Sequence, residues 1–237
     1  MKYTEGYIRS IEEYKLEAFV RQYHRKTSSS GLDWKQLVQY AASHTVNQYF
    51  SLPVSRRTPE AIAHFVEKYW TNRVNKFQSP EHFRLIKMNV TAKLTRFLGQ
   101  AKHLTPMVLF ESFPTYIEEL GLEIAYIVQA LSVNAAGINA PYTIHKYAVD
   151  VTTDMLLLVQ HLTVVCCSKA FASLPQSIVV NCVTSGCSYV CYAKDMDLEK
   201  SLDYIRLMVS AMAETDSIQD RSRATGFHPA FLDEVLS

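Results

Sequence analysis

Glycine is scarce in this 237-residue sequence, which has only 7, and it contains neither a P-loop pattern nor a G-x-G-x-x-G pattern. Because both nucleotide-binding loops need glycines that let backbone amides approach a phosphate, P-loop and Rossmann functions are excluded. An excess of one charge is also lacking, since 24 Lys and Arg are matched by 23 Asp and Glu. A net charge of +1 predicts no overall attraction to nucleic acid, so any such contact requires a local basic patch.

Long apolar runs are missing too. Seven charged residues between Glu5 and Arg21 leave no room for the apolar centre of a signal peptide. The longest apolar stretch, 155–167, contains Gln160 and His161 and is shorter than the ~20 residues of a membrane span. Five cysteines, an odd number without an export signal, are expected to be reduced thiols. We therefore expect a soluble cytoplasmic protein that does not contact the membrane.

The first hundred residues show the apolar spacing of helices. Apolar residues recur every three or four positions over 7–25 and again from Trp34 to about Leu52, which predicts two amphipathic helices. Thr58-Pro59-Glu60 and Ser79-Pro80-Glu81 are typical helix starts, because the hydroxyl caps an amide and proline loses no bond at the first position. The sequence thus predicts four helices before Gly99.

After Pro106 the apolar period changes from that of a helix to that of a strand. Alternation over 122–130 and 142–151 predicts a hairpin with its turn at 134–137, followed by a buried helix that begins after Thr152. A second hairpin (177–181 with 187–193) and a closing helix complete the pattern. We expect an α/β protein in one compact unit, with a helical subdomain at 1–104, an α/β core at 105–213 and an irregular tail at 214–237.

Charge is distributed unevenly along the chain. Between residues 56 and 102 there are ten basic residues and only three acidic ones. The basic residues are Arg56, Arg57, Lys68, Arg73, Lys76, Arg84, Lys87, Lys93, Arg96 and Lys102. With aromatic residues interleaved, this segment is a candidate surface for a phosphate backbone, and all of these residues except Lys102 are taken as candidate nucleic-acid contacts. The alternative is that the charges form an ordinary solvated helix face.

Cysteine and histidine patterns indicate no established metal motif. Cys182, Cys187 and Cys191 lack the C-x2-C spacing of zinc sites, so buried thiols are the favoured interpretation. No H-E-x-x-H pattern or nucleophile elbow occurs. His44 follows small residues in Ala41-Ala42-Ser43-His44. The favoured interpretation is that it forms a hydrogen bond at a boundary where helices pack.

The order of these segments nevertheless resembles the RecB-type branch of the PD-(D/E)XK nuclease superfamily. In that family a metal-binding histidine lies among small residues before an aromatic helix end, and His44 in Ala-Ser-His-Thr-Val-Asn-Gln-Tyr-Phe is similar. The stretches 57–70 and 77–98 resemble the helices that follow. The resemblance implies a restriction-endonuclease-like core, a mixed sheet flanked by helices, behind an N-terminal helical subdomain.

The family's hairpin carries G-x-x-D on one strand and (D/E)-x-K on the next, and the following helix carries Q-x-x-x-Y. Aligned on this pattern, Gln129 takes the place of the aspartate, while His145 and Tyr147 take the acidic and lysine places. Gln160 matches the glutamine of the helix, but its tyrosine is missing. The carboxy-terminal cysteines that bind an iron–sulfur cluster in some relatives are absent from 224–237.

These replacements bear on catalysis because Mg²⁺ needs hard oxygen ligands. Gln129 and His145 supply no carboxylate, so we expect a catalytically degenerate protein without metal or cofactor. Its expected role is that of a DNA-binding or structural subunit, partnered by DNA, a helicase or an active nuclease in DNA repair or defence. One alternative is an active DNA nuclease that uses Mg²⁺ or Mn²⁺ with migrated ligands such as Glu123 or Asp150. The other is a protein-interaction module that does not bind DNA.

Overall fold

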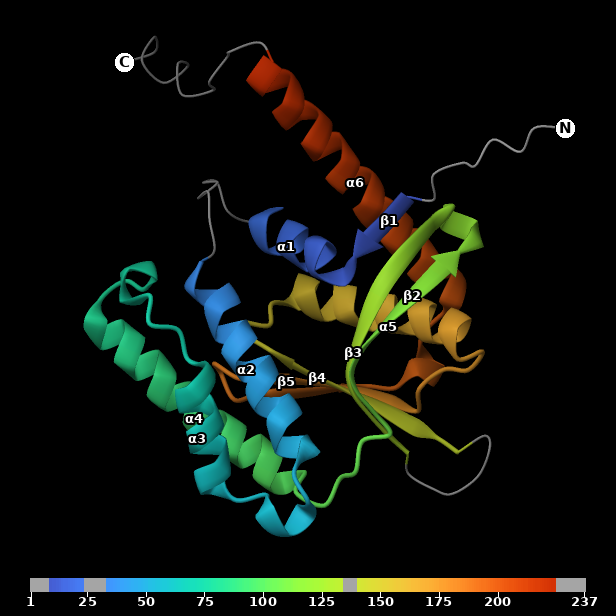
Figure 1. Cartoon of the computed structure of the whole chain (residues 1–237). Coiled ribbons are helices and arrows are strands. Elements are labelled where there is room, and N and C mark those ends of the chain that lie inside the picture. Colours follow the sequence, from blue (N-terminus) through green and yellow to red (C-terminus); the bar gives the residue numbers. More distant parts are fainter. Residues whose placement is uncertain (1–8, 24–32, 134–139, 225–237) are drawn as a thin grey trace, which may run out of the picture.

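A mixed β-sheet with helices on both of its sides forms the centre of the computed structural model, which describes residues 9–23, 33–133 and 140–224 (Figure 1). The strands are β1 (Arg9–Glu12), β2 (Val108–Ile117), β3 (Leu122–Val133), β4 (Tyr142–Ala148), β5 (Ser177–Cys182) and β6 (Ser188–Cys191). Their order is β1-β3-β4-β5-β6, and β2 pairs with β3 as well. The expected α/β class, with a mixed sheet flanked by helices, is confirmed.

The sheet is mixed, because β1 runs parallel to β3 and β4 runs parallel to β5, while the other neighbouring pairs are antiparallel. β2, β3 and β4 are antiparallel neighbours, while β4 and β5 are parallel and are joined by α5 (Thr153–Ala170). A helical crossover is the usual connection between parallel strands. β5 and β6 close the sheet as an antiparallel hairpin.

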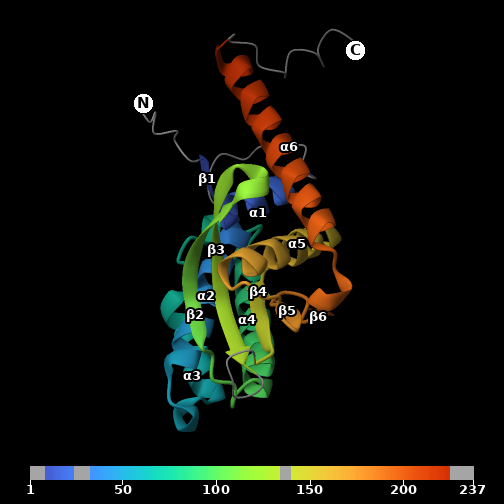
Figure 2. The ribbon, with the colours of Figure 1, turned by 90° about the vertical axis from the view of Figure 1, so that its right-hand side faces the viewer.

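The helices form two groups with separate cores (Figures 1 and 2). α1 (Glu13–Tyr23), α5 and α6 (Leu198–Ala224) share one core with the sheet. α2 (Trp34–Ser51), α3 (Pro59–Tyr69) and α4 (Pro80–Gln100) share a second core, to which Tyr147 and Val149 contribute. Short 3-10 turns lie at Val54–Arg56, Val74–Lys76, Glu118–Leu120 and Ala193–Asp195.

The predicted helix starts are confirmed. The hydroxyls of Thr58 and Ser79 accept the amides of Ala61 and His82, and proline occupies the first turn of both helices. Thr152 caps α5 in the same way, and α5 is buried along most of its length, as its apolar sequence predicts. These boundaries depend on residues within one turn, which is why the sequence predicts them.

Three expectations differ from the structure. Residues 9–12 are a strand rather than part of a helix, and α1, which follows, packs in the sheet's core and not with α2–α4. β1 forms because β3 offers it a free edge, and this tertiary pairing overrides the helical spacing. α6 continues to Ala224, so residues 214–224 are helical and not an irregular tail. The turn expected at 134–137 lies outside the described residues.

Candidate functional site

A gap in strand pairing marks the most unusual polar site in the sheet. β2 covers one edge of β3, so β1 and β4 share the other edge: β1 pairs with 122–125 and β4 with 130–133. Between these two ladders, residues 126–129 of β3 pair with neither strand. We call this place the fork. Buried backbone groups that lose a strand partner need another hydrogen bond, and side chains supply it here.

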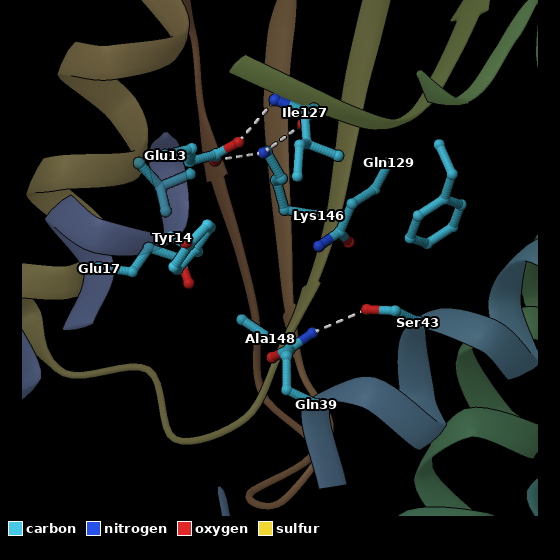
Figure 3. Close-up of a pocket in the computed structure, with 11 residues that line it drawn as sticks. Glu13, Tyr14, Glu17, Gln39, Ser43, Ile127, Gln129, Lys146 and Ala148 are labelled. Atoms are coloured by element: carbon cyan, nitrogen blue, oxygen red, sulfur yellow. Dashed lines mark hydrogen bonds and ion pairs between the residues drawn. The ribbon is translucent and has the colours of Figure 1, made fainter. Parts of the chain in front are cut away.

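At the fork, an ion pair satisfies both backbone groups of Ile127 (Figure 3). Glu13 Oε2 accepts the amide of Ile127 at 2.7 Å, and Lys146 Nζ donates to the carbonyl of Ile127 at 2.6 Å. Lys146 Nζ also donates to Glu13 Oε1 at 2.5 Å, and the two side chains are only 3% and 4% exposed. The Glu13–Lys146 pair therefore stands in for a missing strand partner.

Two glutamine side chains likewise supply hydrogen bonds to backbone groups at the end of β4. Gln129 Oε1 accepts the amide of Tyr147 at 2.6 Å. Gln39, on α2, donates to the carbonyl of Tyr147 at 2.8 Å and accepts the amide of Val149 at 2.9 Å. Its amide nitrogen also reaches Ser43 Oγ at 3.1 Å. These bonds hold α2 against the sheet, so the fork joins the two helical groups.

A cavity of about 220 Å³ opens at the fork. Residues of six elements line it: α1 supplies Glu13, Tyr14 and Glu17, α2 supplies Gln39 and Ser43, and the strands and α5 supply Phe110, Ile127, Gln129, Lys146, Ala148 and Val159. Burial raises the pKa of Glu17, and the nearby Glu13 carboxylate raises it further, although Arg21 pairs with Glu17 at 3.3 Å. Tyr14 is 58% exposed.

The structure brings only one of the aligned hairpin residues to this cavity. Gln129 lines it, and the β4 residues that join it are Lys146 and Ala148. His145 instead reaches Ser132 Oγ at 2.9 Å, and burial lowers its pKa to about 4. Tyr147 is buried in the second core. Alternate residues of a strand point to opposite faces, so the cavity side of β4 is one residue out of phase with the alignment.

The other candidate residues lie elsewhere. His44 stacks on Tyr69 and contacts Tyr40, which agrees with a helix-packing role. Gln160 follows the lining residue Val159 on α5 but does not line the cavity. Glu123 accepts a hydrogen bond from Ser10, and Asp150 forms an ion pair with Lys35. Neither carboxylate joins Glu13 at the cavity.

The residues of the fork do not fit Mg²⁺ or Mn²⁺. Both oxygens of Glu13 and the side-chain oxygen of Gln129 already accept hydrogen bonds, and the Lys146 ammonium adds a positive charge. A divalent ion needs several free oxygen ligands. Within the described part of the chain, no three His, Cys, Asp or Glu residues are grouped so as to hold a metal.

One residue of the basic segment has to be corrected. Arg57 is only 4% exposed, and its guanidinium donates to the carbonyls of Phe50, Leu52, Lys102 and Leu104. It is therefore a structural tie and not a nucleic-acid contact.

Other cations of this segment have partners of their own. Arg84 and Lys87 pair with Glu81 and Glu67, and Arg96 donates to the carbonyl of Gly186. Lys93 packs its side chain against Gly186. Of the cations without such a partner, Arg56, Lys68 and Arg73 are exposed and Lys76 is partly so; Arg84 and Arg96 are exposed as well.

Sequence reasoning missed the partnership at the fork. The family pattern draws attention to His145 and Tyr147 and not to Lys146 between them, and no motif marks Glu13 or Gln39. One signal was present: a lysine inside an apolar strand, Tyr142–Ala148, needs a buried counter-charge. Nothing local identifies Glu13 as that partner.

Comparison with known proteins leaves the family open. No protein-family model matches the chain, and no curated protein is significantly similar to it.

None of the helices within the described ranges is both long and apolar enough to cross a bilayer.

Proposed function

We propose that this chain is a catalytically degenerate relative of the RecB-type PD-(D/E)XK nucleases and acts as a DNA-binding or structural subunit of a nucleic-acid-processing complex. The observation that carries the proposal is the Glu13–Lys146 pair beside Gln129. Of the two aligned metal positions, Gln129 offers only a neutral amide to the cavity and His145 reaches Ser132 instead, while the ammonium of Lys146 takes the cavity side of β4.

The arrangement of elements supports the family part of the proposal. β3 and β4 form an antiparallel hairpin, α5 follows it, and β5 returns parallel to β4. Hairpin and helix have the order that the resemblance implies, and the group α2–α4 precedes them as a helical subdomain. The mixed sheet flanked by helices is the core expected for this superfamily.

The chemistry of the fork supports the loss of catalysis. For a divalent ion to bind Glu13, the Lys146 ammonium would have to leave a site where it is 3% exposed and lies 4.4 Å from the centre of the Tyr126 ring. Its departure would also deprive the carbonyl of Ile127 of its donor. Breaking a buried pair in this way costs about 3–5 kcal/mol. The fork therefore favours its own cation over a metal.

Cations on the surface support the proposal that the chain binds DNA. Lys68 lies in the last turn of α3, and Arg73 and Lys76 lie between α3 and α4. Within the described residues, none of the three forms an ion pair with an acidic side chain. Contacts with phosphates release counterions, so each lysine or arginine that takes part adds close to one unit to the salt dependence of binding. This property separates DNA contact from a merely solvated face.

The experiment measures DNA affinity against salt concentration for the wild type and for K68Q/R73Q/K76Q. A matched control, K169Q/K194Q/K200Q, removes three cations near α5 and α6. We expect the first variant to bind more weakly, with a salt slope about 2–3 units shallower, and the control to bind like the wild type. Absence of salt-sensitive binding by the wild type, or equal effects of both variants, would reject DNA binding by this surface and favour a protein-interaction module.

A further inference from the structure

Three aromatic side chains form a continuous column across α2 and α3. The rings of His44 and Tyr69 are stacked, with centroids 4.9 Å apart and an angle of 21°. The ring of Tyr40 packs on that of His44 at a tilt, with centroids 4.2 Å apart and an angle of 56°. The ammonium of Lys68 lies 5.2 Å from the centre of the Tyr69 ring. Tyr40, His44, Tyr69 and Lys68 are called the aromatic column below.

The Tyr40 end of the aromatic column is exposed to solvent. Tyr40 is 58% exposed, although His44 supports it from behind and Tyr69 supports His44 in turn. A ring that packs against a second ring, which is itself stacked on a third, loses less conformational freedom than a free side chain when a flat ligand binds to it. Tyr40 is therefore prepared for stacking in a way that a freely rotating surface tyrosine is not.

The aromatic column is next to the fork. Gln39 and Ser43 line the cavity, and Tyr40 and His44 directly follow them on α2. Successive residues of a helix point about 100° apart, so the column occupies the neighbouring side of the same helix. Tyr14, on α1, lines the cavity and is also 58% exposed. Tyr14 of α1 thus lies at the cavity, and Tyr40 of α2 lies next to it.

Positive charge accompanies the aromatic column. Lys68 belongs to it, and Arg73 follows α3 in an exposed position. Aromatic rings and cations side by side are the combination that binds single-stranded nucleic acid, because bases stack on the rings and phosphates meet the cations. In a duplex the base faces are already covered by neighbouring bases, so a stacking ring cannot reach them.

We propose that the aromatic column is a base-stacking site for single-stranded nucleic acid, with Tyr40 as the platform. This inference rests on the proposed DNA-binding function and specifies its ligand class. The strand is expected to run past Tyr40 with its phosphates toward Lys68 and Arg73.

Fluorescence anisotropy of labelled oligothymidine and of a labelled duplex tests the inference. Y40A is expected to weaken binding of the single strand roughly 5- to 150-fold, the range for loss of one base–aromatic stack. Y40F keeps the ring and should bind like the wild type. Y116A removes a tyrosine of similar exposure, 48%, from β2 and should have no effect. Because Tyr40 is exposed, all three variants should melt at the wild-type temperature.

The outcomes distinguish this inference from the proposed function. Wild-type binding to both ligands with no loss in Y40A would overturn the stacking site and leave DNA binding intact. Binding of the wild type to the duplex and not to the single strand would also overturn the stacking site and leave DNA binding intact. Absence of binding to either ligand would overturn both proposals. Loss in Y40A and Y116A alike would also contradict a site at Tyr40.

Discussion

Lys146 Nζ lies 2.5 Å from Glu13 Oε1, although 133 residues separate the two in the sequence. The pair joins the first helix of the sheet core to its central hairpin, and both side chains are almost fully buried. It also satisfies the amide and the carbonyl of Ile127. One interaction thus ties α1 to the sheet and occupies the carboxylate of Glu13 with a cation.

The first prediction concerns the strength of this pair. K146M leaves the Glu13 carboxylate buried without its counter-charge and should lower the free energy of unfolding by about 3–5 kcal/mol. E13Q should also destabilise, and the double variant E13Q/K146M should lose less than the sum of the two. Urea unfolding measures all three.

The control for this cycle is K169M. Lys169 pairs with Glu119 at the same distance, 2.5 Å, but the two side chains are 30% and 40% exposed. Such a pair contributes less than about 1 kcal/mol. If K146M were no more destabilising than K169M, the Glu13–Lys146 pair would not stabilise the sheet in place of a strand partner.

The second prediction is a pH dependence from His145. Burial lowers the pKa of this histidine from 6.5 to about 4, so the folded protein keeps it neutral in a range where the unfolded chain binds a proton. Stability should therefore fall as the pH drops from 6.5 toward 4, by up to about 3 kcal/mol in total. H145Q should lack this part of the acid sensitivity. Parallel stability curves for the two proteins over this range would contradict the prediction.

Arg57 gives a third prediction, which separates folding from binding. R57A removes the donor from four carbonyls and should cost about 3 kcal/mol or more. R57K should rescue little, because a lysine cannot spread its hydrogen bonds in the planar geometry of a guanidinium. R56A, at the exposed neighbour, should unfold like the wild type. Equal stability of R57A and R56A would show that Arg57 is not the tie that its contacts indicate.

Thiol reactivity gives a fourth prediction. Burial raises the pKa of Cys167 to about 12 and also raises that of Cys166, whereas Cys187 is exposed. Iodoacetamide should therefore modify Cys187 in the native protein and reach Cys166 and Cys167 only after unfolding. Peptide mapping by mass spectrometry gives the order, and labelling of Cys166 or Cys167 at the rate of Cys187 would contradict the packing of α5.

Cys182 is a distinct case within the same experiment. Burial raises its pKa, but hydrogen bonds from Ser185 and Thr184 outweigh this effect and lower it to about 7. The thiol is 2% exposed, so access and not ionisation should limit its reaction. Labelling should accelerate in mild denaturant that opens the hairpin.

The sequence predicts features that depend on near neighbours. Thr58 and Ser79 begin helices because their hydroxyls reach amides three residues ahead, and the apolar surface of α5 predicts its burial. β1 was missed because four residues that continue a helical pattern form a strand only when β3 presents its free edge. That edge lies more than a hundred residues away.

The candidate site was predicted in part for the same reason. The strand that contains Gln129 lies where the alternation predicts it, but an alignment shifted by one residue along β4 moves every side chain to the other face. Lys146 therefore took the cavity side and His145 did not. Glu13 could not be predicted, since only the folded chain brings α1 to Ile127.

The most direct test of the account is a cleavage assay with labelled single- and double-stranded DNA in Mg²⁺ or Mn²⁺. The wild type is expected to show no metal-dependent cleavage, because Lys146 holds Glu13 and Gln129 supplies no carboxylate. E123Q and D150N should be equally inactive. Cleavage by the wild type that E13Q, E123Q or D150N abolishes would contradict the account and establish an active nuclease with ligands at other positions.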